Sequence, residues 1–180
     1  MIDSDRLRLR IWRDSDRNAF AALNADPKVT QDLGGPLDRT ASDAKFDRYV
    51  AAFEQRGFCR WALERLDGQF LGYAGVMPSR PGHPLGPHAD IGWRLVHSAW
   101  GQGYATEAAR AALRDAFERA HLNEVLAYTS VDNVRSQAVI KRLNMQRAAP
   151  LDYSESLGAG MWHGLVWRAR PEDGPYGLGL

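Results

Sequence analysis

The stretch HSAWGQGYATEAARAAL (residues 97–113) decides the fold, because it joins a glycine-rich turn to an amphipathic helix. Glycine turns sharply without steric cost and leaves open space beside the backbone. A helix N-terminus presents unpaired N–H groups and the positive end of the helix dipole, so it attracts phosphate. Gly101 and Gly103 therefore indicate a turn that holds a phosphate-bearing ligand, although an ordinary strand-to-helix turn would use the same residues.

Two common phosphate-binding loops do not fit this stretch. A P-loop ends in Gly-Lys-Ser or Gly-Lys-Thr, and the chain contains neither tripeptide. The dinucleotide-binding fingerprint G-x-G-x-x-G/A would place Thr106 at its third small position. That fingerprint also belongs to an early βαβ unit, whereas this chain begins its sheet with a predicted hairpin around Asp67-Gly68.

Hydrophobic periodicity around the stretch predicts a mixed sheet with helices on its faces, in the order βααβββαβαββ. Seven strands are expected, at residues 6–12, 58–66, 69–77, 88–96, 124–130, 145–151 and 161–170. Helices are expected at residues 14–27, from about 40 to 56, after Gly103 and at residues 133–143. The predicted fold class is α/β (α+β), with a mostly antiparallel sheet.

Local signals give the ends of three of these helices. Thr40 with Asp43 predicts a capping arrangement at the start of the second helix, and Gly57 predicts its end. Asn144 suits the left-handed position that ends the last helix. In the helix after Gly103 the small residues fall on one face, which would let the helix lie close to the sheet; they are Ala105, Ala109, Ala112 and Ala116, with Leu113 beside them.

Length and charge restrict the class of protein. The 180 residues suit one domain, predicted over residues 1–170 with a loose tail at residues 171–180. The formal charge of +1 gives no overall basic field for nucleic acid or an anionic membrane. A single cysteine excludes an intramolecular disulfide framework, and there is no apolar leader or membrane-length run. These features predict a cytoplasmic monomer or homodimer.

Two longer segments together resemble a known family. DIGWRLVHSAWGQGYATEAARAAL (residues 90–113) and VLAYTSVDNVRSQAVIKRLNM (residues 125–145) are similar to the central motifs of the GNAT acetyltransferases. The resemblance extends over roughly residues 6–168, including the N-terminal RLRLR and the strand segment GFCRWALE, and it is strongest to the branch of ribosomal-protein-alanine N-acetyltransferases. It implies a single-domain GNAT-like fold and an acyl-CoA-dependent N-acetyltransferase.

The resemblance also implies a co-substrate, acetyl-CoA, and the residues that bind it. The pyrophosphate would rest on the backbone N–H groups of the glycine turn, and the pantetheine arm would run along the end of the preceding strand. Asn133 and Ser136 match positions beside the pantetheine and sulfur, and Arg142 is a candidate partner of the nucleotide phosphates. The remaining implied cofactor residues are Leu95, Val96, Gly101, Gln102, Gly103, Tyr104, Ala105 and Thr106.

Acetyl transfer to an amine needs a neutral amine, an N–H donor for the thioester oxygen and a proton for the departing thiolate. The backbone at residues 95–96 is expected to supply the N–H donor. Many GNAT enzymes place a tyrosine seven residues after the helix-starting asparagine, but here that position is Ile140. Ser136 is then the candidate proton donor by position, and its alternative role is a first-turn hydroxyl that bonds backbone.

Two acidic residues are candidates for the general base. Asp90 begins the strand where this branch often carries a glutamate, and a water would have to bridge its shorter side chain to the amine. Its alternative role is a strand-edge carboxylate paired with an arginine such as Arg94. Glu155 is a second candidate, or a solvated loop residue. Both carboxylates would also attract a cationic acceptor.

No metal site is expected. His83, His88 and His97 form no compact ligand motif and are interpreted as surface or loop residues, although His88 or His97 could relay a proton. Cys59 lies between aromatic residues in a predicted strand, which favours a buried structural thiol over a nucleophile. Trp100 precedes the glycine turn and is expected to pack against it.

The acceptor is a primary amine, either a small molecule or a protein N-terminus, and the loops that would select it are residues 28–39, 79–87 and 152–160. Two alternatives stay open: a CoA-binding module without catalysis, and a transferase that uses another acyl-CoA such as succinyl-CoA.

Overall fold

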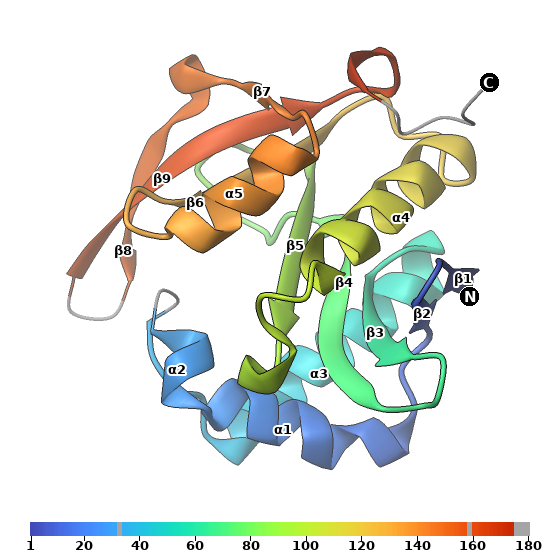
Figure 1. The fold of residues 1–180 in the computed structure, drawn as a ribbon. Helices are drawn as coiled ribbons and strands as arrows, with labels where there is room; N and C mark the ends of the chain where they lie inside the picture. Colours follow the sequence, from blue (N-terminus) through green and yellow to red (C-terminus); the bar gives the residue numbers. More distant parts are fainter. Residues whose placement is uncertain (32–33, 158–159, 175–180) are drawn as a thin grey trace.

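A computed structural model describes residues 1–31, 34–157 and 160–174, and these residues build one sheet flanked by helices (Figure 1). The strands of the described chain lie in the order β1-β2-β3-β4-β5-β6-β9-β7, with β8 also paired to β9. They are β1 (Ile2–Asp3), β2 (Leu7–Arg10), β3 (Arg60–Arg65), β4 (Phe70–Pro78), β5 (Ala89–Leu95), β6 (Val125–Ser130), β7 (Gln146–Arg147), β8 (Tyr153–Leu157) and β9 (Gly160–Ala169).

Helices cover both faces of the sheet. In Figure 1, α4 and α5 lie in front of the strands, α3 lies behind them, and α1 and α2 lie at the lower end. Their bounds are α1 (Arg17–Ala25), α2 (Pro27–Thr30), α3 (Arg39–Arg56), α4 (Tyr104–Glu118) and α5 (Val134–Arg142). The mixed, mostly antiparallel fold class predicted from the sequence is confirmed.

The pairing of β5 with β6 interrupts the sheet. These strands are parallel, and their register contains one position only, Asp90 opposite Leu126. Every other strand pair among the described residues is antiparallel and continues over two or more positions. The two strands therefore separate after Asp90, and β5 keeps an edge without strand partner up to Leu95.

Small side chains bring α4 close to the front face of the sheet. Ala109, Ala112 and Ala116 are buried as the helical periodicity predicts, with Leu113 beside them. Ala74 of β4 is fully buried as well. Because these alanines are small, α4 can lie close to the strands that carry the site.

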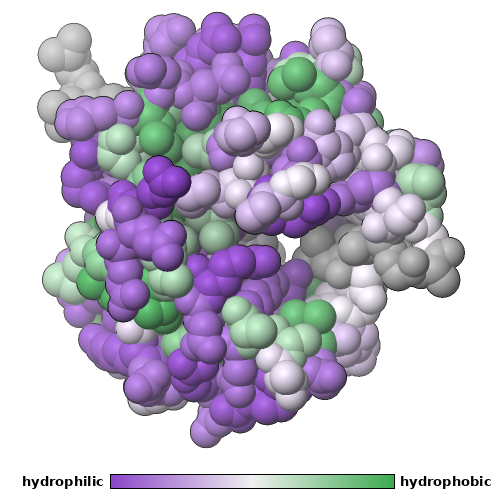
Figure 2. Space-filling view, turned by 180° about the vertical axis from the view of Figure 1, so that it is seen from behind, coloured by the Kyte–Doolittle hydropathy of each residue, from purple (hydrophilic) through white to green (hydrophobic). Residues whose placement is uncertain are grey.

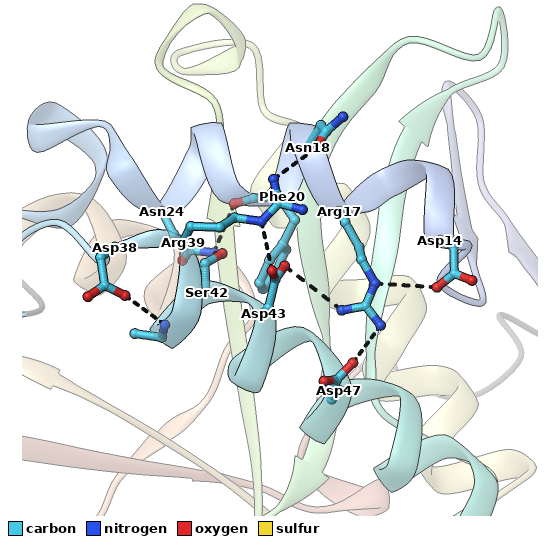
Figure 3. Close-up of polar contacts among 11 residues, drawn as sticks. Asp14, Arg17, Asn18, Phe20, Asn24, Asp38, Arg39, Ser42, Asp43 and Asp47 are labelled. Carbon is cyan, nitrogen blue, oxygen red and sulfur yellow. Dashed lines mark hydrogen bonds and ion pairs between the residues drawn. The ribbon is translucent and has the colours of Figure 1, made fainter.

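Aromatic rings fill the layer between the back of the sheet and the helices α1 and α3. Phe20 of α1 packs edge-on against Phe46 and Tyr49 of α3, and Tyr73 of β4 lies against both Phe20 and Tyr49. Polar contacts join the outer surfaces of the two helices, as Figure 3 shows for Arg17 with Asp43 and Asp47, and for Arg39 with Asn18. The two helices consequently act as one support behind β4 and β5.

Three local expectations are corrected. The described chain forms nine strands rather than seven, because β1 pairs with β2 and because β8 occupies part of the predicted loop 152–160. The segment 145–151 contains only the two-residue strand β7 and a short 3-10 helix. The helix α3 starts one residue before Thr40, and Asp38 caps it by accepting a hydrogen bond from the Ala41 N–H at 2.8 Å.

The helix predicted over residues 14–27 is divided into a 3-10 turn and α1, and α2 was not predicted, whereas two helix ends agree with the sequence. Gly57 ends α3 with φ of 74°, and Asn144 follows α5 with φ of 54°. In the predicted tail, Pro171–Asp173 form a short 3-10 helix, and residues 175–180 lie outside the described residues. Among the described helices, none has the length and apolar character to cross a membrane. Hydrophilic residues cover most of the face shown in Figure 2, with hydrophobic residues in scattered patches.

Gly72 sets the close approach of β4 to β5 and gives a test of this packing. Its φ is +135°, and a Cβ there would lie 2.1 Å from the Arg94 carbonyl oxygen. The strained φ and the collision together predict that Gly72→Ala costs about 2–5 kcal/mol. We expect a melting temperature lower by roughly 4–20 °C.

The control is Gly82→Ala, which also has a positive φ of +72° but no atom within 4 Å of the added Cβ. Its loss, measured in the same thermal denaturation, should be less than half that of the Gly72 variant. Equal losses would contradict the packing account.

Candidate functional site

A cavity of about 860 Å³ opens beside the glycine turn. Ten of the eleven residues predicted to bind a cofactor line it, whereas Val96 does not. The ten are Leu95, Gly101, Gln102, Gly103, Tyr104, Ala105, Thr106, Asn133, Ser136 and Arg142. Of the three catalytic candidates, Ser136 lines the cavity, while Asp90 and Glu155 do not. The structure thus brings together the glycine turn and the start of α5, which are separated in the sequence by α4 and β6.

The glycine turn adopts the backbone geometry that only glycine accepts easily. Gly101 has φ of 75° and Gly103 has φ of 81°, and a Cβ at Gly101 would meet no atom within 4 Å. The first intrahelical bond of α4 runs from the Glu107 N–H to the Gly103 carbonyl. The N–H groups of residues 104–106 have no partner among the described residues. This end of α4 is therefore an open set of donors at the positive end of a helix dipole.

Arg6, which precedes β2, fixes this turn and was not singled out from the sequence. Its guanidinium donates to the Gln102 carbonyl at 3.1 Å and to the Glu107 carboxylate at 2.8 Å. It also lies over the Tyr104 ring, 4.7 Å from the centroid. Burial opposes ionisation of Glu107, but hydrogen bonds from Arg6 and Ser4 hold the pKa of this carboxyl below its usual range. The signal in the sequence was the predicted N-terminal strand itself, which delivers Arg6 to the helix start.

The free edge of β5 supplies backbone groups on the other side of the cavity. The Val96 N–H donates to the Leu71 carbonyl at 2.9 Å, so this donor is already used. Because N–H groups alternate in direction along a strand, that of Leu95 points to the opposite edge, toward the gap beside β6. The Leu95 carbonyl accepts from the Trp100 indole at 3.0 Å, which ties Trp100 to the end of β5, and Trp100 also lines the cavity. Of the two expected N–H donors, only Leu95 faces the gap.

The start of α5 forms the third wall. The Asn133 side chain caps the helix by accepting from the Ser136 N–H at 3.0 Å. The Ser136 hydroxyl has no hydrogen-bond partner among the described residues, so its alternative role as a backbone-bonding hydroxyl finds no partner there. Ile140, at the position where many GNAT enzymes carry tyrosine, is 1% exposed and belongs to the core.

Arginines gather at the cavity, and most of them were missed from the sequence because they lie on separate elements. Arg110 of α4 donates to the Arg142 carbonyl at 3.3 Å, which places two guanidinium-bearing residues side by side. Arg135 lies over the Trp100 ring, 4.3 Å from its centroid. The cavity lining contains five arginines, namely Arg6, Arg94, Arg110, Arg135 and Arg142, against the carboxylates Asp5 and Glu107. The site therefore favours an anionic ligand.

Asp90 is held in a buried ion pair. It is 6% exposed, and its carboxylate binds the guanidinium of Arg60, which also donates to the Asp90 carbonyl at 2.6 Å. The partner expected from the sequence was Arg94, which instead binds Asn24 at 2.6 Å. Glu155 of β8 is paired with Arg80 of the loop after β4. These contacts favour the alternative role of Asp90 as an ion-pair partner. Glu155 is paired and lies in a strand, so it is not the solvated loop residue that was its alternative.

The histidines and the cysteine lie away from the cavity lining. His97 is exposed, but His83 is 7% exposed and is bonded to the Tyr153 hydroxyl at 3.1 Å, so His83 is not a surface residue. Burial lowers the pKa of His83 below its ordinary value. Cys59 is fully buried, and burial raises the pKa of its thiol to about 12, as expected for a structural residue. Within the described residues, no cluster of three or more histidine, cysteine or acidic side chains is arranged to hold a metal.

Comparison with known families shows to which family the chain belongs. The family described as "Acetyltransferase (GNAT) domain" matches residues 6–146. The chain belongs to the GNAT acetyltransferase family. It is an acyl-CoA-dependent acetyltransferase, as the resemblance in the sequence indicates.

Relatives and solved structures agree with this assignment. The Bacillus subtilis protein YkkB is 29% identical over 144 residues, which cover 79% of this chain and 83% of YkkB. An acetyltransferase from Agrobacterium tumefaciens superposes with a TM-score of 0.80 at 28% identity, covering 94% of this chain and 93% of that one. RimL, a ribosomal L7/L12 acetyltransferase in complex with coenzyme A, shares the fold with a TM-score of 0.73 at 19% identity, covering 93% and 95%.

The family uses acetyl-CoA, and the cavity of this chain suits such a molecule in its chemistry. The unpartnered N–H groups of residues 104–106, at the start of α4, can donate to a diphosphate. The adjoining arginines can bind further phosphate charge. The unpaired edge of β5 offers backbone groups to an amide-containing chain.

Asp90→Asn distinguishes an ion-pair role from a catalytic one. Loss of the carboxylate charge leaves the buried Arg60 guanidinium without a counter-charge, which costs about 3–5 kcal/mol. We expect a melting temperature lower by roughly 6–20 °C. Glu155→Gln, which breaks a partly exposed pair, should change stability by about 0–1 kcal/mol.

Thermal denaturation and steady-state kinetics of both variants provide the check. An Asp90→Asn protein with wild-type stability and a much lower kcat would show that Asp90 acts in catalysis rather than in the ion pair.

Proposed function

We propose that the protein is an N-acetyltransferase that moves the acetyl group of acetyl-CoA to a primary amine by direct attack within a ternary complex. The observation that carries this proposal is the set of unpartnered N–H groups at residues 104–106, open to a cavity beside two glycines of positive φ. A diphosphate would accept from these N–H groups, and Arg110 with Arg142 would bind the remaining phosphate charge.

The reacting thioester would lie in the gap between β5 and β6. A pantetheine arm that follows β5 would meet the strand's unpaired edge, where amide groups can bond as in a sheet. The Leu95 N–H faces this gap, so it would stabilise the negative charge that develops on the thioester oxygen. The Val96 N–H, bonded to Leu71, takes no part in this scheme.

In the proposed reaction the amine nitrogen attacks the thioester carbon, the new C–N bond forms and the C–S bond breaks. Ser136 would donate the hydroxyl hydrogen bond, directly or through water, to the departing sulfur, and its free hydroxyl beside the cavity supports this role. The amine gives up one proton to solvent and the sulfur gains one. Since the carboxylates of Asp90 and Glu155 are paired with arginines, they would act as bases only through intervening water.

The sequence left open a CoA-binding module without catalysis, and the family assignment favours the acetyltransferase instead. Ile140, buried in the position of the usual tyrosine, cannot supply a proton, so Ser136 is the proposed donor. Release of free thiol from acetyl-CoA in the presence of amines measures the transfer. A succinyl-CoA-dependent enzyme would release thiol from that donor instead.

Ala105→Asp tests the proposed diphosphate site by adding a negative charge in the first turn of α4. Ala105 lines the cavity and also packs against the core, so the stability of the unliganded variant is measured beside its affinity for acetyl-CoA. The same charge would repel the diphosphate, so the affinity for acetyl-CoA should fall at least about tenfold, equivalent to about 1.4 kcal/mol. Ala105→Ser is the matched uncharged control.

Thermal shift with acetyl-CoA gives both readings in one assay. For the wild-type protein, acetyl-CoA at about a hundredfold excess over its Kd should add about 2.7 kcal/mol of stability. No shift with acetyl-CoA or succinyl-CoA, or an unaltered acetyl-CoA affinity in Ala105→Asp, would contradict the proposed site.

A further inference from the structure

The cavity passes from one face of the sheet to the other. Consecutive side chains of a strand point to opposite faces, yet Trp93, Arg94 and Leu95 of β5 all line the same cavity. Arg94 stands directly opposite Tyr73 of β4, so its side chain points to the face that α1 and α3 cover. Val29 of α2 also lines the cavity on this side. The back of the cavity, away from the glycine turn, is the side from which an acceptor would approach β5.

Asn24 of α1 is oriented toward this back wall. It is fully buried, and its side-chain amide donates to the Phe20 carbonyl at 2.9 Å and to the Ser42 hydroxyl at 3.3 Å. Figure 3 shows both contacts, of which the first lies within α1 and the second joins α1 to α3. Because its nitrogen is used there, the amide oxygen faces Arg94 and Lys45, at 2.6 Å and 3.4 Å.

Only one nitrogen of the Arg94 guanidinium has a partner among the described residues. Nη1 donates to Asn24, and the group lies 5.8 Å from the Tyr73 ring centroid. Nε is buried without a hydrogen bond, and no bond is formed by Nη2 with the described chain. Nε and Nη2 make one edge of the planar group, and this is an edge that a carboxylate can bind with both oxygens. An unsatisfied buried donor is costly, so a ligand that accepts from it would be favoured.

Lys45 and Tyr73 are the titratable side chains nearest to Arg94, and burial lowers the pKa of Lys45. Lys45 of α3 donates to the Tyr73 hydroxyl at 3.2 Å. Burial alone would raise the pKa of Tyr73, but Arg94 and Lys45 lower it to about 7. The cavity lining contains two carboxylates, Asp5 and Glu107. Asp5 precedes Arg6 in the chain, and Glu107 is bound by Arg6 at the start of α4. No carboxylate among the described lining residues faces the back wall to receive a polyamine.

We propose that the acceptor is an amine that also carries a carboxylate, and that Arg94 binds this carboxylate on the α1/α3 side of the cavity. This inference rests on the proposed function, since it names the class of acceptor for the same site. Arg94 is adjacent to Leu95, whose N–H faces the thioester gap. A carboxylate on Arg94 would therefore hold an amino group a few bonds away next to the reacting carbon, as in a short amino acid.

The inference is tested with pairs of amines that differ in this charge alone. The probes are glycine, β-alanine and 4-aminobutyrate, each compared with its carboxamide, and acetyl transfer from acetyl-CoA is followed by thiol release. We expect the best carboxylate to have a kcat/KM roughly 10- to 100-fold above that of its carboxamide, the range for a hydrogen-bonded charge pair. Affinities of the same probes for the protein–CoA complex are measured by calorimetry.

Arg94→Gln should remove this preference while acetyl-CoA binding stays within about twofold, because Arg94 lies on the face away from the glycine turn. Arg94→Lys, which keeps the charge but not the planar fork, should recover part of the preference. The matched control is Arg17→Gln, which removes one positive charge from the polar contacts between α1 and α3 outside the cavity lining. It should leave the preference unchanged.

The outcomes separate this inference from the proposed function. If carboxylates bind the CoA complex through Arg94 but no amine is acetylated, the proposed function fails and the anion site stands. If carboxamides or polyamines are acetylated as well as the carboxylates, or if Arg94→Gln keeps the preference, the inference is overturned and the transferase stands. If neither transfer nor Arg94-dependent binding of any carboxylate probe is found, both are overturned.

Discussion

The separation of β5 from β6 after a single paired position is the constraint on which the site depends. A fully paired sheet would bond the amides of β5 to β6, and no backbone donor would face a ligand. The gap instead leaves the N–H of Leu95 without a strand partner, opens a passage between the two faces of the sheet and places α4 and α5 on either side of it. A cavity for an extended substrate follows from this one missing pairing.

The glycine turn also leaves backbone groups free for a ligand. Backbone N–H groups at the start of α4 become a ligand site only if the chain before them turns away and carries no side chain there, which Gly101 and Gly103 achieve at positive φ. Arg6 holds the turn from the neighbouring strand by binding both its carbonyl at Gln102 and the carboxylate of Glu107. The site is thus built mainly from backbone, and side chains fix its shape.

What the sequence predicts well is what depends on neighbours along the chain. The periodic strands, most of the alanine face of α4, the glycine turn and the start of α5 next to Asn133 follow from local spacing. Contacts between elements far apart in the chain could not be predicted from local spacing. Arg60, rather than Arg94, pairs with Asp90, because Arg60 and Asp90 meet only when β3, β4 and β5 pair. In the same way, the sequence predicts a loop where β8 lies, because the pairing of β8 with β9, rather than the hydrophobic pattern of its own residues, makes it a strand. The position of Arg94 behind the cavity likewise follows from its register with Tyr73.

The central proposal is that the unpartnered backbone N–H groups at residues 104–106 bind the diphosphate of CoA. Nuclear magnetic resonance of the uniformly ¹⁵N-labelled protein, titrated with CoA, observes these groups one by one. The account predicts the largest amide proton shifts, toward lower field, at Gly103, Tyr104, Ala105 and Thr106, and much smaller shifts when pantetheine, which lacks the diphosphate, replaces CoA. CoA binding that leaves these resonances in place while shifting those of other elements would contradict the account.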